Sequence, residues 1–228
     1  MKTNKAGVLS GTALKLIAMV SMVFDHVGDN FFPDLVWMRV LGRIAMPIFA
    51  FCVAEGFRRT HDRKKYLARM LLFAAISEIP FDLVTAGKYL ESGHQNIMFT
   101  FSWAILGLIC FDGILGGEKA RWRYPVAAAA AVFFAVSSVF LRLDYNILAV
   151  ALIFTWYMMK DRPLWAGTAA AAAVHVALRN MGIYWFGLLG FVPILFYNGE
   201  RGRGLKWLFY LFYPGHLLLI FMLRKMLL

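Results

Sequence analysis

Nine long apolar windows, separated by short connections, constrain the fold of this chain more than any other feature. They lie at residues 12–32, 36–57, 66–86, 96–114, 124–141, 145–159, 163–179, 181–198 and 205–226. A helix that crosses about 30 Å of hydrocarbon needs roughly 20 mostly apolar residues. The 228 residues are 61% hydrophobic and 16% charged, too apolar for a globular core of this size. The sequence therefore predicts an all-α, polytopic transmembrane helix bundle of nine spans, within a range of eight to ten, as one domain over 1–228.

Lys and Arg gather in every second connection between the windows, near residues 58–69, 119–123, 160–162 and 201–206. The connections between these hold one basic residue or none. Cytoplasmic loops of membrane proteins carry such an excess, in contact with anionic lipid. The pattern predicts a multi-pass membrane protein whose N-terminus, with Lys2 and Lys5, lies in the cytoplasm. It also explains the excess of 24 Lys and Arg over 13 Asp and Glu without nucleic acid as a partner.

The two cysteines, Cys52 and Cys110, lie inside apolar windows without CxxC spacing. Two thiols so placed are too few for a disulfide framework or a zinc site, and thiols buried in a membrane mostly serve packing. We therefore expect no metal site.

Ionisable residues inside the windows are the candidate functional groups, because charges are costly in hydrocarbon. Lys15 and His26 are eleven residues apart, so on a helix they share one face within about 20° and differ by a rise of about 16 Å. An imidazole suits a general base because its unperturbed pKa lies near neutrality, and a carboxylate can orient it. His26 and Asp25 are thus the candidate catalytic residues, although adjacent helical positions point in different directions. The alternative is a histidine satisfied by a neighbouring helix or by lipid headgroups.

Basic residues in the second window and around the start of the third are candidate anion-binding groups. Arg43 lies several turns into its window, where its guanidinium could pair with a buried carboxylate or hold an anionic ligand. The cluster Arg63–Lys65, with Arg69 at the start of the third window, has two interpretations. The commoner one is a basic collar that faces lipid headgroups. The sharper one is a docking site for a phosphate-rich cofactor.

Five further residues are candidates for the lining of a polar pocket: Glu55, Asp82, Asp144, Tyr213 and His216. Tyr213 and His216 flank a Pro-Gly pair, which can free backbone carbonyls and kink the last helix. Packing aromatics are the alternative there. His26, His216 and the carboxylates could equally form the proton relay of a transporter.

A set of segments, in order over almost the whole chain, resembles the TraX family. They are Leu14–His26, Gly42–Phe51, Glu55–Phe57, Arg63–Arg69, Ser77–Asp82, Asn96 with Phe99-Thr100, Asp144-Tyr145 and Phe209–His216. The family's namesake acetylates the N-terminus of conjugative pilin. The family is in turn similar to the membrane acyltransferases of acyltransferase family 3, whose first span carries Lys or Arg, ten residues and then His. The interval from Lys15 to His26 matches that spacing.

The resemblance implies an acyltransferase family 3-like fold in the bacterial inner membrane and acetyl transfer from acetyl-CoA, the donor substrate. It implies that His26 is the catalytic histidine and that Lys15 and Arg43 surround the donor. Arg63 and Arg69 would also contact the donor, although the Arg-x-x-Arg element of acyltransferase family 3 is not present verbatim near 63–69.

Three classes of function are compatible with these residues. The first is an acetyltransferase whose acceptor is a protein N-terminus, a glycan hydroxyl or a small amine. The second is a proton-coupled transporter, although no internal repeat is visible. The third is a non-catalytic assembly factor for a pilus or envelope complex. The sequence leaves open whether the chain forms a homo-oligomer.

Overall fold

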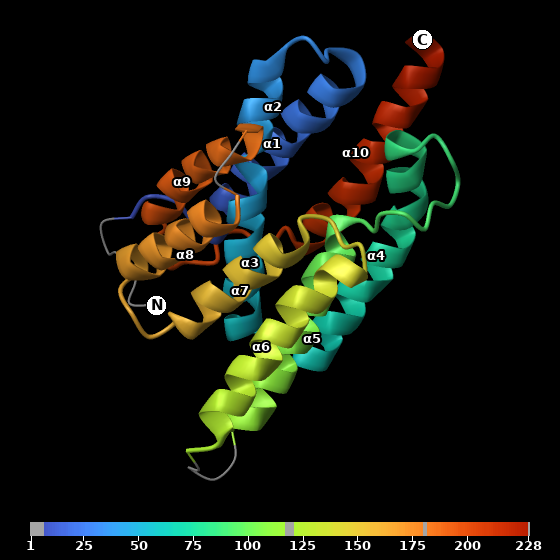
Figure 1. Ribbon diagram of the computed structural model, residues 1–228. Coiled ribbons are helices and arrows are strands. Elements are labelled where there is room, and N and C mark those ends of the chain that lie inside the picture. The colour runs from blue at the N-terminus through green and yellow to red at the C-terminus, as the bar shows by residue number, and fades with distance from the viewer. Residues whose placement is uncertain (1–6, 117–120, 180–181, 228) are drawn as a thin grey trace.

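The computed structural model describes residues 7–116, 121–179 and 182–227 (Figure 1). Lys2 and Lys5 of the N-terminal segment and Lys119 of the basic connection 119–123 lie outside the described residues. Within the described ranges there is no strand, only two isolated β-bridges. The helices are α1 (Gly11–Phe31), α2 (Val36–Gly42), α3 (Ala45–Arg59), α4 (Arg63–Thr85), α5 (Ile97–Leu115), α6 (Arg123–Phe140), α7 (Asn146–Met158), α8 (Leu164–Leu178), the 3-10 helix η1 (Gly182–Gly190), α9 (Phe191–Leu195) and α10 (Lys206–Leu227).

Each of the nine apolar windows coincides with helical structure, which confirms the all-helical prediction. Five stretches are long and apolar enough to cross a membrane by length and composition: α1, α2 with α3, α5, α6 and α10. Helix α4 has 23 residues but carries charged residues in both halves. Helices α7 and α8 have 13 and 15 residues, and the stretch from η1 to α9 is also short. The chain thus has the helices of a membrane protein, while the count of nine spans stays a prediction.

Local sequence signals explain where several helices begin. The side chain of Ser10 accepts a hydrogen bond from the backbone N–H of Ala13, and Asp62 and Asn96 cap α4 and α5 in the same way. A polar side chain at this position satisfies a backbone donor that the helix itself leaves without a partner. These caps fix the starts of α1, α4 and α5.

Pro47 explains why the second window is divided into α2 and α3. A proline has no N–H for the carbonyl four residues earlier, and its ring pushes against that carbonyl. For Pro47 this carbonyl belongs to Arg43, and the helix is interrupted at Arg43 and Ile44. The interruption places the Arg43 side chain at a bend in the middle of the window.

The helices run back and forth between two ends of the molecule. At one end, the N–H of Gly11 at the start of α1 donates to the carbonyl of Glu200, 2.8 Å away, in the connection before α10. Arg63 at the start of α4 pairs with Asp112 near the end of α5 at 2.5 Å, and the Tyr157 hydroxyl near the end of α7 donates to the same carboxylate. We call this the basic end, because it collects the described parts of the Lys- and Arg-rich connections.

The connections that follow α1, α4 and α6 meet at the opposite end. There the N–H of Gln95 donates to the carbonyl of Arg142 at 2.9 Å, so the connections before α5 and α7 lie together. Arg224 near the end of α10 reaches Asn30 near the end of α1 at 3.4 Å. In the described residues, these alternate connections therefore share an end, as the charge pattern predicts.

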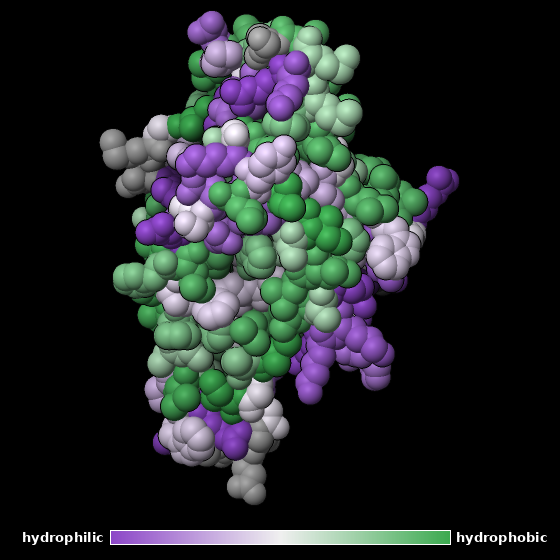
Figure 2. Space-filling view, turned by 90° about the vertical axis from the view of Figure 1, so that its right-hand side faces the viewer, coloured by the Kyte–Doolittle hydropathy of each residue, from purple (hydrophilic) through white to green (hydrophobic). Residues whose placement is uncertain are grey.

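Helix α3 lies in the middle of the bundle, with α1 and α10 on one side and α7 to α9 on the other (Figure 1). Its Phe51 packs edge-on against Trp156 of α7 and against Tyr197, and these three side chains are buried. The surface is apolar as well. Hydrophobic residues cover much of the face on the side of α4 and α10, and hydrophilic residues gather in separate patches (Figure 2). Exposed side chains such as Leu72 and Leu219 belong where lipid is the solvent.

Candidate functional site

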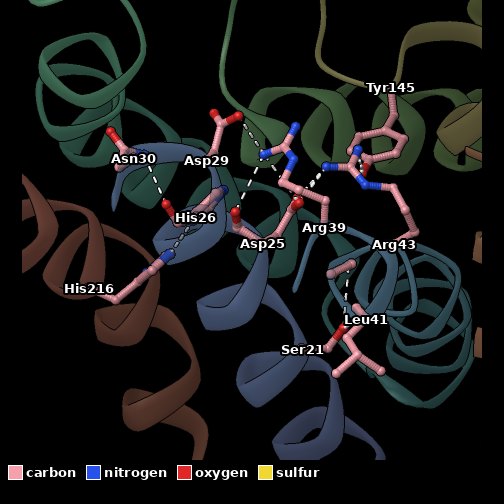
Figure 3. Close-up of polar contacts among 11 residues, drawn as sticks. Ser21, Asp25, His26, Asp29, Asn30, Arg39, Leu41, Arg43, Tyr145 and His216 are labelled. Atoms are coloured by element: carbon pink, nitrogen blue, oxygen red, sulfur yellow. Dashed lines mark hydrogen bonds and ion pairs between the residues drawn. The ribbon is translucent and has the colours of Figure 1, made fainter. Parts of the chain in front are cut away.

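A buried ion pair joins the first two windows. Both carboxylate oxygens of Asp25 accept from the same terminal nitrogen of Arg43, at 2.5 and 2.6 Å (Figure 3). The guanidinium also donates to the Tyr145 hydroxyl at 2.9 Å, and Arg43 is only 5% exposed. Arg39 approaches Asp25 from the more exposed side at 3.2 Å. Asp25 therefore serves the two arginines and points away from His26 (Figure 3).

Gly42 makes this close approach possible. A Cβ atom on Gly42 would lie 2.3 Å from Cβ of Asp25 and 2.7 Å from its Cα. Real Cβ atoms do not come so close, so any larger residue here would push α1 away from the second window. The Gly-Arg pair at positions 42 and 43 thus supplies both the contact between the helices and the cation.

His26 bonds to His216, a histidine 190 positions later. His26 Nδ1 lies 2.8 Å from His216 Nε2, and His216 Nδ1 lies 2.8 Å from the carbonyl oxygen of Phe212 (Figure 3 shows the histidine pair). The two imidazole planes differ by 10°, and their centroids are 5.0 Å apart. Because the two nitrogens are only 2.8 Å apart while the ring centres are 5.0 Å apart, the rings meet edge to edge and do not stack face to face. A hydrogen bond to a lone pair in the ring plane requires this arrangement.

The direction of these bonds fixes the tautomers of both neutral rings. A carbonyl can only accept, so His216 Nδ1 carries the proton and His216 Nε2 has a lone pair. His26 Nδ1 must then donate to that lone pair, which leaves His26 Nε2 unprotonated. Among the described residues no hydrogen-bond donor contacts His26 Nε2. The arrangement holds a histidine with a free lone pair, which is the state that a general base needs.

A cavity of about 460 Å³ runs from the basic end toward this histidine pair. Its basic wall residues are Lys15, Arg59, His61, Arg69, Arg201, Arg203 and Lys206. Its interior is mainly apolar, and its wall includes Met22, Phe212 and Tyr213. Met22 lies one helical turn before His26, and the Phe212 ring stacks on His216 at 4.5 Å between centroids. The cavity therefore ends about one turn short of His26.

Sequence comparison decides the family. A family model described as TraX protein matches residues 10–224, a range that holds the ion pair, the histidine pair and the cavity. The chain belongs to the TraX family. No solved structure is significantly similar to it.

Three relatives of this TraX-family chain illustrate its range. It is 28% identical to the probable fimbrial assembly protein FimC, serogroup H1, of Dichelobacter nodosus, over 92% of the chain and 94% of that protein. It is 28% identical to Protein TraX of Escherichia coli, over 65% of the chain and 57% of that protein. An uncharacterized protein of Rickettsia prowazekii is 38% identical over 66 residues, which are 29% of the chain and 25% of that protein.

The structure brings four of the predicted site residues into the cavity wall: Lys15, Glu55, Arg69 and Tyr213. Lys15 lies along the cavity with its ammonium 4.8 Å from the centre of the Phe209 ring. Glu55 is bound by two arginines of its own helix and by the Tyr197 hydroxyl.

The other predicted site residues lie outside this wall. Asp25 and Arg43 form the buried ion pair, and His26 and His216 lie beyond the inner end of the cavity. Arg63 pairs with Asp112, and its guanidinium lies 4.5 Å from the centre of the Phe57 ring.

Asp82 and Asp144 lie at the opposite end of the molecule from the cavity mouth. Asp82 accepts from the N–H of Glu91 at 2.7 Å, and Asp144 lies 3.4 Å from the His94 ring. The hydrogen bond to Asp144 raises the pKa of His94, which lies in the connection between α4 and α5. These contacts hold connections together and do not reach the cavity wall.

The connection before α10 belongs to the cavity, although the sequence does not predict this. Arg201, Arg203 and Lys206 line the mouth of the cavity beside Arg59. Their sequence signal is the basic connection near 201–206, which by itself indicates only topology. Nothing in spacing alone indicates that this connection folds against the start of α1.

Proposed function

We propose that this protein is a membrane-embedded acetyltransferase that moves an acetyl group from acetyl-CoA to an amine or hydroxyl acceptor. The observation that carries the proposal is the cavity, which has a basic mouth, an apolar interior and an inner end one turn from an unprotonated histidine nitrogen. A thioester donor with a phosphate-rich end and a slender apolar arm has the matching distribution of charge. Membership in the TraX family supports the same chemistry.

The donor enters from the basic end, which is the cytoplasmic end in this proposal. Arginine and lysine side chains bind phosphate through charge-assisted hydrogen bonds. Lys15, deeper in the wall, lies between the mouth and the inner end and contacts the donor's arm. The thioester reaches His26 only by passing Met22, Phe212 and Tyr213, which close the inner end.

His26 acts as the general base in the transfer step. Its Nε2 takes a proton from the acceptor nitrogen or oxygen, which forms a bond to the thioester carbonyl carbon. The carbon–sulfur bond breaks, and the coenzyme A thiolate takes that proton from His26 Nε2 and leaves as the thiol, which restores the unprotonated base. His216 holds His26 in the productive tautomer and shares the positive charge that His26 acquires through their hydrogen bond.

The acceptor approaches from the end opposite the basic mouth, in a bacterial inner membrane with the N-terminus in the cytoplasm. A protein N-terminus, such as that of a pilin, is the acceptor that the TraX resemblance favours. The relative named as a probable fimbrial assembly protein supports a role in surface appendages.

Purified protein with radiolabelled acetyl-CoA and an acceptor peptide tests the proposal. A general base contributes roughly 10²–10⁴-fold, so His26→Ala should lose most of the transfer rate while it stays folded. His94→Ala is the matched control, because the His94 ring contacts Asp144 and Phe81 and neither lines the cavity nor bonds to the histidine pair. A near wild-type rate in His26→Ala would refute the assignment of the base.

The same preparation separates the rival functions. Ion flux in liposomes without acetyl transfer would support a proton-coupled transporter. A pilus or envelope phenotype that survives substitution of Lys15, Arg43 and His26, yet requires the protein, would support an assembly factor. Mass spectrometry of membranes with and without the protein, read for an added acetyl group, would identify the acceptor.

A further inference from the structure

Three basic side chains at the mouth of the cavity have no anionic partner. Arg201, Arg203 and Lys206 line the cavity, are exposed, and form no ion pair among the described residues. Arg59 beside them is already bound to Glu55 at 2.6 Å. A group of unpaired cations around one opening attracts an anion more strongly than paired cations do.

The backbone of this connection is held to the start of α1. The N–H of Thr12 donates to the carbonyl of Arg201 at 3.0 Å, and the Thr12 hydroxyl donates to the carbonyls of Arg201 and Arg203 at 3.0 and 2.7 Å. Thr12 is itself buried. Both arginines are therefore anchored at their own backbone to the helix that carries Lys15 and His26.

Gly202, between the two arginines, allows this docking. Its φ of +74° is a conformation that favours glycine, and a Cβ there would lie 2.5 Å from Oγ of Ser10 and 2.9 Å from Cβ of Thr12. The short repeat Arg-Gly-Arg-Gly thus combines two cations with the backbone freedom that packs them against α1. A basic connection whose only role is to set the orientation in the membrane would not need a backbone packed against α1.

We infer that the connection 199–205, together with Lys206 at the start of α10, is the phosphate site of the donor and binds its adenosine 3′,5′-bisphosphate end through Arg201, Arg203 and Lys206. The inference rests on the proposed function, which supplies a coenzyme A thioester as the ligand. It assigns the phosphates to this connection and not to the cluster at Arg63–Lys65. Arg63 is already bound to Asp112 and does not line the cavity.

Binding to the purified full-length protein in nanodiscs tests the site with three probes. Coenzyme A carries a 3′-phosphate and a diphosphate, dephospho-coenzyme A lacks the 3′-phosphate, and adenosine 3′,5′-bisphosphate lacks the pantetheine arm. In the double variant Arg201→Ala with Arg203→Ala, we expect the dissociation constant of coenzyme A to rise roughly tenfold for each charge-assisted hydrogen bond removed. The preference for coenzyme A over its dephospho form should shrink as well.

Two controls separate a specific site from a general loss of charge. Arg162→Ala removes a positive charge from the same end, outside the cavity wall, and should leave the affinity for coenzyme A unchanged. The pair Arg201→Lys with Arg203→Lys keeps the charge and should restore part of the affinity. An unchanged coenzyme A affinity in the double alanine variant, or an equal loss in Arg162→Ala, would overturn the inference.

The outcomes also separate this inference from the proposed function. Binding of adenosine 3′,5′-bisphosphate that depends on both arginines, without acetyl transfer by the wild type, would uphold the site and refute the enzyme. Acetyl transfer by the wild type, with wild-type coenzyme A affinity in the double alanine variant, would uphold the enzyme and refute the site.

Discussion

His216 should control the rate of acetyl transfer through the tautomer of His26. Replacement of His216 by Ala removes the nitrogen that accepts from His26 Nδ1 at 2.8 Å. The proton of the neutral His26 ring can then move to Nε2, where it occupies the lone pair that the base needs. The variant keeps the base itself but no longer has the group that orients it.

The size of the effect follows from the one hydrogen bond that the substitution removes. A neutral hydrogen bond contributes a net 0.5–1.5 kcal/mol in typical cases, about 1 kcal/mol. Because about 1.4 kcal/mol corresponds to a factor of ten in rate, His216→Ala should lower kcat roughly two- to tenfold. This is much less than the roughly 10²–10⁴-fold expected for loss of His26. KM for acetyl-CoA should change little, since His216 does not line the cavity.

Steady-state acetyl transfer by four variants provides the assay: His26→Ala, His216→Ala, the double variant and His216→Gln. The glutamine oxygen can accept from His26 Nδ1, so His216→Gln should recover part of the rate. Because His216 acts through His26, the double variant should be no slower than His26→Ala alone. A His216→Ala rate equal to that of the wild type would refute the tautomer argument. A rate as low as that of His26→Ala would make His216 itself a reacting group.

Three further predictions concern residues around this pair and at the opposite end. Lys15→Ala should raise KM for acetyl-CoA and leave acceptor affinity unchanged; unchanged donor affinity would remove Lys15 from the site. Asp25→Ala should lower the free energy of unfolding by about 3–5 kcal/mol, because it leaves Arg43 as a buried unpaired charge, and Asp25→Ala with Arg43→Met should recover most of this stability in thermal unfolding. Asp144 raises the pKa of His94 in the folded protein. The interaction between the two residues therefore stabilises the fold fully at a pH below the unfolded-state pKa of His94, about 6.5, and this stabilisation is lost as the pH rises through the folded-state pKa. The difference in Tm between wild type and His94→Gln should therefore shrink from about pH 6 to about pH 8; a constant difference would contradict this.

The helices could be predicted from the sequence because a long apolar run identifies a membrane helix by itself. No amphipathic periodicity is needed. Continuous apolar runs bounded by charged connections give each window, whereas the caps at Ser10, Asp62 and Asn96, which set the exact starts of three helices, are seen only in the structure. The internal hydrogen-bond pattern could not be predicted in the same way. The window 181–198 is divided into a 3-10 helix and a short α-helix, Gly182–Gly190 and Phe191–Leu195, and apolar composition does not distinguish these forms.

In the site, the positions of residues along one helix could be predicted from the sequence, but the contacts between helices could not. Helical spacing places Lys15, Met22 and His26 on one stripe of α1, and the cavity follows this stripe from Lys15 to Met22. It also indicates that Asp25 cannot orient His26, and in the structure Asp25 instead binds Arg43. The partner of His26 is 190 positions away, so no spacing rule could identify it.

The same limit explains why the sequence points to Arg63 and not to the connection before α10. In the sequence, Arg63 and the arginines before α10 look alike, because both lie in basic connections. Only their neighbours in the folded structure distinguish them. Asp112 neutralises Arg63, whereas Thr12 binds the backbone of Arg201 and leaves its side chain free. We therefore expect charge in a connection to form a binding site only where the fold supplies no internal anion and places the cation beside a cavity. By this criterion the mouth formed with α10 is the part of the basic end that is suited to bind a phosphate-rich donor.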